Sequence, residues 1–257
     1  MQHLLFTQEE GIGVVTLNRP QAFNATNMDL FAELEECQMI IEKDHSIRAV
    51  VINASGEHFS VGVDLHMLKQ VDSQFILNSL NWLQRLYSRW QEMPVPVIAA
   101  VQGLCYGSGV ELILGCDMRV AAEDARFAIP EVRFGLSPDM GGTVRLTKLV
   151  GTGQAKRLIM GCEEIDAAEA LRIGLVEVVV PRGQLVERAM KIAEKMAALP
   201  PAAIRFAKKG INLADESSVM AGLLFEQAQS TFCCGTEDFT EAVNAFLEKR
   251  KPVFKGR

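Results

Sequence analysis

The stretch from residue 96 to residue 136, PVIAAVQGLCYGSGVELILGCDMRVAAEDARFAIPEVRFGL, decides the fold. It begins with VIAAVQG, which has the apolar composition of a buried strand, and passes through a glycine-rich turn into the helical segment GSGVELILG. Two short extended segments, MRVAAED and ARFAIPE, follow. Strands that alternate with helices in this way are typical of α/β proteins. The stretch therefore predicts an α/β core.

The alternation continues on both sides of this stretch. Apolar periodicity predicts strands at residues 3–8, 13–18, 48–55 and 176–180, and helices at residues 28–44 and 75–90. From about residue 142 the pattern is mostly helical, and residues 200–251 are expected to be entirely helical. The sequence thus predicts an α/β core over residues 1–195 and a helical C-terminal region over residues 196–257.

Composition restricts the possible functions. The 257 residues are 49% hydrophobic and carry a net charge of -6, which argues against nucleic-acid binding as the main function. The six cysteines form no C-x-x-C pair and have no metal-ligand spacing with the histidines, so they are expected to be reduced thiols, with no metal site. Neither a secretory signal nor an apolar run of about 20 residues is evident. These features predict a cytoplasmic protein without membrane contacts.

One charged residue interrupts the apolar helix in the central stretch. Glu111 lies between Val110 and Leu112, directly after a turn with glycines at 107 and 109. An unpartnered buried carboxylate is costly, and its pKa rises in response. An acid in a first helical turn can simply complement the helix dipole, whereas the free amides of a strand–glycine–helix turn can stabilise developing negative charge.

Two further acids favour the chemical interpretation. Glu131 follows Glu111 by 20 residues, enough for a helix, a strand and a turn to bring the side chains together, and Asp139 follows 8 residues later. Alone, each would be interpreted as a solvated loop acid. Together, beside a glycine-rich turn and apolar walls, they indicate carboxylates with separated pKa values for acid/base catalysis.

Motifs along the whole chain resemble those of the crotonase (enoyl-CoA hydratase/isomerase) superfamily. Besides the central stretch they are TLNRPQAFNA (16–25), FSVGVDL (59–65), GGTVRLTKLVG (141–151), AAEALRIGLVEVVVP (167–181) and AFLEKRKPVFKG (245–256). The resemblance implies a crotonase-type spiral of ββα units with a helical C-terminal trimerisation region. It also implies a homotrimer, or a homohexamer built from two trimers.

The resemblance also assigns roles to individual residues. It implies that the backbone amides of Val63 and Ser108 form an oxyanion hole for an acyl-CoA thioester, with larger side chains than the small residues of the family, which could narrow the pocket. Coenzyme A is part of the substrate, and no separate cofactor is expected. The loop from Val61 to Leu65 would approach the adenine and pantetheine, and Phe246 and Lys249 would reach coenzyme A on a neighbouring subunit.

A lysine that the family often places near the phosphates is Gln21 here. That substitution weakens one expected electrostatic contact. Arg19 either compensates for it or has a structural partner instead.

Two reactions match the three acids. In hydratases of the family, the residues matching Glu111 and Glu131 add water across a 2-enoyl-CoA, with Glu131 as the expected proton donor to C2. In Δ3,5-Δ2,4-dienoyl-CoA isomerases, the residues matching Asp139 and Glu131 move protons along a conjugated chain. Some hydratase-like members also carry the Pro-Asp pair, so the sequence favours the hydratase and leaves the isomerase as the alternative.

Two other functional classes compete less well. One branch of the family binds AU-rich RNA through basic surface residues, which the acidic balance here does not favour. A catalytically idle acyl-CoA binder would have no need of three acids.

Overall fold

Two β-sheets organise the chain in the computed structural model, which describes residues 1–256. The larger sheet has the strand order β1-β2-β3-β4-β6-β9, and the smaller has the order β5-β7-β8. In the larger sheet β1 is antiparallel to β2, and every other neighbouring pair is parallel. The strands are β1 (Leu4–Glu9), β2 (Ile12–Leu17), β3 (Ala49–Ala54), β4 (Val97–Val101), β5 (Leu104–Tyr106), β6 (Met118–Ala122), β7 (Arg126–Ala128), β8 (Ile165–Asp166) and β9 (Val178–Val180).

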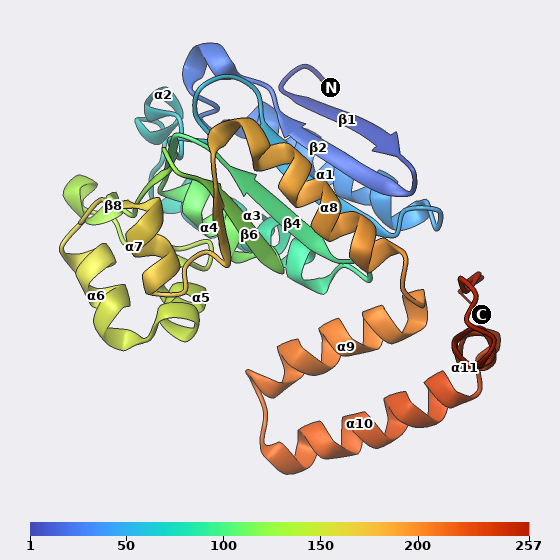
Figure 1. Cartoon of the computed structure of the whole chain (residues 1–257). Helices are drawn as coiled ribbons and strands as arrows, with labels where there is room; N and C mark the ends of the chain where they lie inside the picture. Colours follow the sequence, from blue (N-terminus) through green and yellow to red (C-terminus); the bar gives the residue numbers. More distant parts are fainter. Residues whose placement is uncertain (257) are drawn as a thin grey trace.

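Helices cover both faces of the larger sheet (Figure 1). They are α1 (Met28–Lys43), α2 (Leu65–Leu68), α3 (Ser73–Glu92), α4 (Ser108–Leu114), α5 (Gly142–Val150), α6 (Thr152–Met160), α7 (Ala167–Arg172), α8 (Leu185–Ala197), α9 (Pro201–Ala214), α10 (Val219–Cys234) and α11 (Glu237–Leu247). Short 3-10 helices are η1 (Pro20–Ala22), η2 (Glu131–Phe134) and η3 (Arg182–Gln184).

Alternating side chains of the parallel strands enter two separate cores. In β3, Val50 and Ile52 join the core that includes α1, α3 and α4, whereas Ala49 and Val51 join the core under α8. Successive residues of a strand point to opposite faces, so a strand with helices on both sides needs an uninterrupted apolar run. This requirement explains the runs RAVVINAS and VIAAVQG, and it confirms the α/β fold class.

The smaller sheet makes the fold a spiral. After β4 the chain enters β5 and then α4, and after β6 it enters β7 before η2 and α5. The loop after β3 follows the same course, because Ser60 forms a parallel bridge with Cys105 of β5. Each turn therefore contributes one strand to the large sheet and one extended segment to a second layer. The residues that follow these extended segments, at 61–65, 107–111 and 129–131, are brought to one edge of the second layer.

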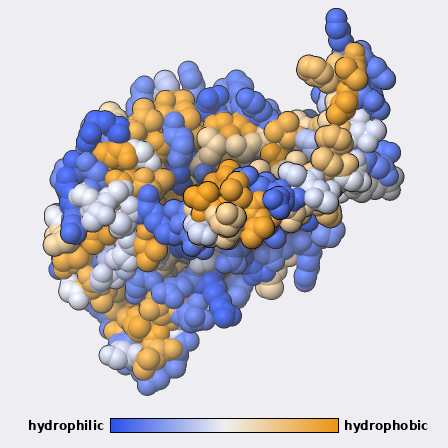
Figure 2. All heavy atoms as spheres, turned by 90° about the horizontal axis from the view of Figure 1, so that it is seen from below, coloured by the Kyte–Doolittle hydropathy of each residue, from blue (hydrophilic) through white to orange (hydrophobic). Residues whose placement is uncertain are grey.

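The C-terminal helices extend away from this core (Figure 1). The last strand of the large sheet ends at Val180 and α8 ends at Ala197, and α9, α10 and α11 follow outside the core. Apolar side chains remain exposed on these helices, including Ile211, Met220, Leu224 and Phe246, and a view from the side of α9 and α10 shows apolar residues gathered on their surface (Figure 2). The boundary predicted at residue 195 falls within α8, and the division into two regions stays a prediction.

Several sequence-based boundaries need correction. The segment LCYGSG contains the strand β5 before its turn, because Leu104 and Tyr106 are paired with β7. The last helix ends at Leu247 instead of reaching residue 251, and the helical stretch from 200 onward is interrupted between α9 and α10 and between α10 and α11. None of the helices within residues 1–256 is long and apolar enough to cross a membrane.

A buried ion pair connects α9 to the core. Lys208 Nζ donates to Asp117 Oδ2 at 2.7 Å and to the carbonyl oxygens of Trp90 and Val95, both at 3.0 Å. Asp117 Oδ2 also accepts from the amide of Val97, at the start of β4. All three protons of the ammonium group therefore have acceptors, and α9 is held against the beginning of β4.

Replacing Lys208 tests this connection. Lys208→Met leaves the Asp117 carboxylate without its cation in a largely buried place, so we expect a loss of about 3 kcal/mol in the free energy of unfolding. Lys148→Met is the matched control, because Lys148 pairs with Asp215 at 3.0 Å in an exposed position, and we expect it to cost less than about 1 kcal/mol. Urea unfolding followed by circular dichroism measures both. Equal losses in the two variants would show that the buried pair does not fix α9.

Candidate active site

A tight turn between β5 and α4 forms the centre of the site. Gly107 has φ 51° and ψ -122°, a conformation that strongly favours glycine. A Cβ atom added at Gly107 would lie 2.8 Å from Glu131 Oε1. The absence of a side chain therefore lets the Glu131 carboxyl group lie directly against the turn that precedes Glu111.

Glu111 is almost completely buried, with 1% of its surface exposed. Its Oε1 accepts hydrogen bonds from the backbone amides of Met140, at 2.9 Å, and Gly142, at 2.8 Å. The pKa of Glu111 is raised to about 7, mainly by burial and also by the charges of Glu131 and Asp139, while the two amide hydrogen bonds act in the opposite direction. The carboxyl group thus bonds the loop before α5 instead of capping α4.

Glu131 is the second acid of the site. It begins η2, directly after Pro130, and its Oε2 is buried without a hydrogen-bond partner within residues 1–256. Burial raises its pKa, and the nearby charge of Asp139 adds to this effect. A buried carboxyl oxygen without a partner carries a free-energy cost, which a bound substrate or water can remove.

Asp139 lies on the loop between η2 and α5 and is more exposed than the two glutamates. Desolvation by the surrounding atoms still raises its pKa. Its backbone carbonyl accepts from Gln84 Nε2 at 2.8 Å, which connects the loop to α3. Asp139 also borders a cavity of about 1240 Å³ among α3, α5, α8 and α9. The charge of Asp139 raises the pKa of both glutamates, so its carboxyl group lies within electrostatic range of both.

The segment that carries Val63 packs against the Gly107 turn. Gly62 has a φ of 95°, and a Cβ atom there would lie 3.1 Å from the carbonyl oxygen of Tyr106 and 3.5 Å from the amide nitrogen of Ser108. Ser108 begins α4, so its amide has no acceptor within the helix. Within residues 1–256, neither the Val63 amide nor the Ser108 amide donates to a backbone carbonyl. Two unused amides therefore lie on adjacent segments beside Glu111 and Glu131.

The remaining binding residues predicted from the sequence lie in two places. Val61 and Leu65 flank the Val63 segment, and Leu65 is exposed. Phe246 and Lys249 are also exposed, but they lie at the end of α11, on the opposite side of the molecule from α2 (Figure 1). The structure does not bring these last two residues to the site of their own chain.

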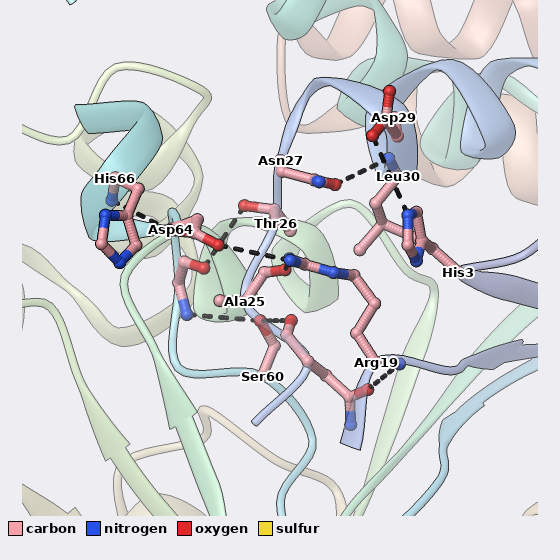
Figure 3. Close-up of polar contacts among 12 residues, drawn as sticks. His3, Arg19, Ala25, Thr26, Asn27, Asp29, Leu30, Ser60, Asp64 and His66 are labelled. Carbon is pink, nitrogen blue, oxygen red and sulfur yellow. Dashed lines mark hydrogen bonds and ion pairs between the residues drawn. The ribbon is translucent and has the colours of Figure 1, made fainter. Parts of the chain in front are cut away.

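Arg19 has a structural partner. Its Nη2 lies 3.3 Å from Asp64 Oδ2, and its Nη1 donates to the carbonyl oxygen of Ala25 (Figure 3). Asp64 directly follows Val63, so the guanidinium group fixes the loop of the candidate oxyanion hole. Of the two roles considered for Arg19, the structure shows the structural pairing.

Comparisons with known proteins identify the family. The family model described as "Enoyl-CoA hydratase/isomerase" matches residues 7–257. The chain belongs to the enoyl-CoA hydratase/isomerase family. It is 39% identical to the "Short-chain-enoyl-CoA hydratase" of Clostridium acetobutylicum, over 100% of this chain and 99% of that protein. It is 38% identical to the "2,3-dehydroadipyl-CoA hydratase" of Escherichia coli, over 100% of both.

A solved structure shows the same fold. The crystal structure of an enoyl-CoA hydratase from Bacillus anthracis superimposes with a TM-score of 0.96 at 34% identity, covering 100% of both chains. This likeness confirms the crotonase-type spiral, and family membership shows that the protein is an enzyme of the enoyl-CoA hydratase/isomerase type.

Residues that support Glu111 were not identified from the sequence. The amides of Met140 and Gly142 belong to the segment MGGTVRL, which contains two adjacent glycines, and a Cβ atom at Gly142 would lie 2.9 Å from Glu111 Oε1. Arg145 supports the same loop, because its Nη1 donates to the carbonyl oxygen of Met140 at 3.2 Å and its Nη2 donates to Ser88 Oγ at 2.8 Å. The two adjacent glycines were the available signal for a close approach of another group.

The raised pKa of Glu111 has a consequence for stability. Between about pH 4.5 and pH 7 the folded chain keeps a proton on Glu111 that the unfolded chain has released, so stability falls as the pH rises through this range. Glu111→Gln cannot titrate, and its side-chain oxygen can still accept from both amides. We expect this variant to be more stable than the unmodified chain at pH 8, by up to about 3 kcal/mol, with a much smaller difference at pH 5.

Urea unfolding at the two pH values measures this difference. Glu187→Gln is the control, because Glu187 is exposed on α8 and its hydrogen bond with Lys191 lowers its pKa. It should give no gain at pH 8. A stability difference for Glu111→Gln that does not change between pH 5 and pH 8 would contradict a raised pKa.

Proposed function

We propose that this enzyme adds water to the C2=C3 double bond of a 2-enoyl-CoA thioester by syn addition. The observation that carries the proposal is the pair of glutamates, buried Glu111 and half-buried Glu131 with its buried Oε2 atom, beside the two unused amides of Val63 and Ser108. The hydratase names of the relatives support the same reaction.

The two amides would act on the thioester carbonyl. Addition at C3 and protonation at C2 pass through enolate-like negative charge on the carbonyl oxygen. Amides that are already fixed can stabilise this charge without rearranging, and removing one such donor costs ~10²–10³ in rate in known cases. The position of Ser108 at the first turn of α4 adds the partial positive charge of the helix N-terminus.

The two carboxyl groups would divide the proton transfers. Ionised Glu111 takes a proton from water while the water oxygen bonds to C3, and protonated Glu131 gives its proton to C2. Exchange with solvent then restores both groups. A pKa of about 7 makes Glu111 an effective base near neutral pH, and burial makes Glu131 easier to protonate than an ordinary glutamate because it raises the pKa of that carboxyl group. Both residues would contact the same water, which gives syn addition.

These steps use only carboxyl groups and amides of the chain. Coenzyme A enters as part of the substrate, and the segment that includes Val61, Val63 and Leu65 would bind it. Leu65 is exposed beside the Val63 amide, which is consistent with contact to the pantetheine portion.

Asp139 supports a second candidate, a Δ3,5-Δ2,4-dienoyl-CoA isomerase. Its carboxyl group is close enough to raise the pKa of Glu131, so a proton could be removed at one end of a diene and returned at the other. Asp139 is the most exposed of the three acids, however, and the less exposed pair of glutamates favours hydration.

Three variants distinguish the reactions. We expect Glu111→Gln and Glu131→Gln each to lower kcat for crotonyl-CoA hydration by ~10²–10⁴, because each removes one acid/base group. Asp139→Asn should keep most of the kcat of the unmodified chain. Absorbance of the enoyl thioester measures hydration, and a 3,5-dienoyl-CoA assay measures isomerisation. Full hydration by either Gln variant would exclude the two-glutamate mechanism. Dienoyl conversion that depends equally on Asp139 and Glu131, without hydration, would instead identify the isomerase.

We also propose that the C-terminal helices assemble the chain into a homotrimer or homohexamer. The exposed apolar side chains of α9, α10 and α11 support this assembly, as does the remote position of Phe246 and Lys249, which would reach coenzyme A in a neighbouring subunit.

A mass measurement and one variant test the assembly. Sedimentation should give the mass of three or six chains, and Phe246→Ala should raise KM for crotonyl-CoA by roughly tenfold, as expected when an aromatic contact to a ligand is lost. Phe239→Ala is the control, because Phe239 is also exposed on α11 but has no predicted contact with coenzyme A. A monomer that is fully active would contradict the proposal.

A further inference from the structure

Two buried hydroxyl groups connect segments that are far apart in the sequence. Thr26 Oγ1 and Ser108 Oγ lie 3.0 Å apart, and each residue is only 1% exposed. Thr26 precedes α1, whereas Ser108 begins α4. Buried hydroxyl groups need hydrogen-bond partners, so this contact constrains the relative position of the two segments.

The backbone of Thr26 holds the Val63 segment. The Thr26 amide donates to the carbonyl oxygen of Gly62 at 2.8 Å, and the Asp64 amide donates to the carbonyl oxygen of Thr26 at 2.9 Å. These two bonds form a parallel bridge between Thr26 and Val63. In such a bridge the amide of the central residue points away from the partner strand. The Val63 amide is therefore directed away from Thr26 and stays unused.

Neighbouring contacts make this arrangement rigid (Figure 3). Arg19 bonds both Ala25 and Asp64, on either side of the bridge. Ser60 Oγ donates to the carbonyl oxygen of Asn24 at 2.8 Å. The segment around Thr26 and the segment around Val63 are thus joined at several points, and a shift of one would move the other.

The Ser108 side chain completes the connection. Its hydroxyl group contacts Thr26, while its own amide is the second unused donor of the site. The backbone of Thr26 thus holds the segment of one donor, and its hydroxyl group contacts the residue that supplies the other. Because the Ser108 hydroxyl group is buried against Thr26, it does not narrow the acyl pocket.

We propose that the hydroxyl contact between Thr26 and Ser108 sets the spacing of the Val63 and Ser108 amides and so determines how strongly they polarise a bound thioester carbonyl. The inference rests on the proposed function, in which these amides form the oxyanion hole. Thr26 and the Ser108 side chain are positioning groups, because their hydroxyl groups are buried against each other and not exposed to a ligand. Their effect acts on the carbonyl oxygen and not on the proton transfers of the two glutamates.

Butyryl-CoA labelled with ¹³C at its thioester carbonyl is the probe. It is saturated, so it binds without reacting, and infrared difference spectra report the carbonyl stretch in the bound state. In the unmodified chain the stretch should move to lower frequency on binding. Thr26→Val keeps the shape of the side chain and removes the hydroxyl group, so we expect a clearly smaller shift. Thr26→Ser keeps the hydroxyl group and should retain most of the shift.

Hydration kinetics of crotonyl-CoA provide the second readout. A displaced oxyanion donor should lower kcat roughly tenfold to a hundredfold and change KM little. Thr26→Val also removes a longer contact, 3.4 Å, from Thr26 Oγ1 to the carbonyl oxygen of Gly62. Ser108→Ala should therefore lower kcat as Thr26→Val does or slightly less, and the double variant should be no slower than Thr26→Val, because both substitutions break the contact between Thr26 and Ser108. Thr7→Val, on the exposed face of β1, is the matched control and should equal the unmodified chain.

The outcomes separate this inference from the proposed function. A wild-type carbonyl shift in both Thr26→Val and Ser108→Ala, or kcat losses that multiply in the double variant, would overturn the positioning role. If the unmodified chain lowers the carbonyl stretching frequency of butyryl-CoA but adds no water to crotonyl-CoA, the proposed hydratase function is wrong. The carbonyl shifts of the variants then still test the role of the hydroxyl pair. If the unmodified chain gives no shift at all, the amide pair is not an oxyanion hole and the inference fails with it.

Discussion

The buried carboxyl group of Glu111 is the constraint on which the site depends. One of its oxygens accepts hydrogen bonds from two backbone amides of the loop at the start of α5. The Glu111 side chain therefore joins α4 to α5. The glycine at position 142 is required by this close approach, and Arg145 holds the same loop from the other side. The Glu111 carboxyl group therefore holds the loop in place and is also a candidate for proton transfer, and burial is the main reason that its pKa is near neutrality.

The second layer of the spiral explains why distant residues meet. Each turn of the chain adds one short extended segment to this layer, and the bridges of Ser60 with β5 and of β5 with β7 stack these segments. Val63, Ser108 and Glu131 each follow one of them within a few residues. Backbone hydrogen bonds thus bring the candidate catalytic groups to one place, and in our proposal the hydroxyl contact of Thr26 with Ser108 sets the spacing of the two amides.

The sequence predicted much of this arrangement. Strands buried on both faces have continuous apolar runs, so β3 and β4 were predicted correctly, and the segment after the glycine-rich turn predicted α4. The position of Glu111 in this apolar helix indicated its raised pKa. The strand β5 was missed because three residues beside a glycine-rich turn have no periodicity to detect. The acceptor role of Glu111 and the contact between Thr26 and Ser108 were also missed. They join residues 29 or more positions apart through geometry that only the folded chain supplies.

The site and the C-terminal helices differ in whether they need a second chain. The acids and amides of the site come from one chain, whereas the predicted coenzyme A contacts of Phe246 and Lys249 require another. The most direct measurement of the central claim is therefore made on the site itself. Titration of glutamate carboxyl groups labelled with ¹³C, with Glu111 assigned by the loss of its signal in Glu111→Gln, reports its pKa by nuclear magnetic resonance. The account predicts a value of about 7, and a value near the ordinary 4.5 would contradict it.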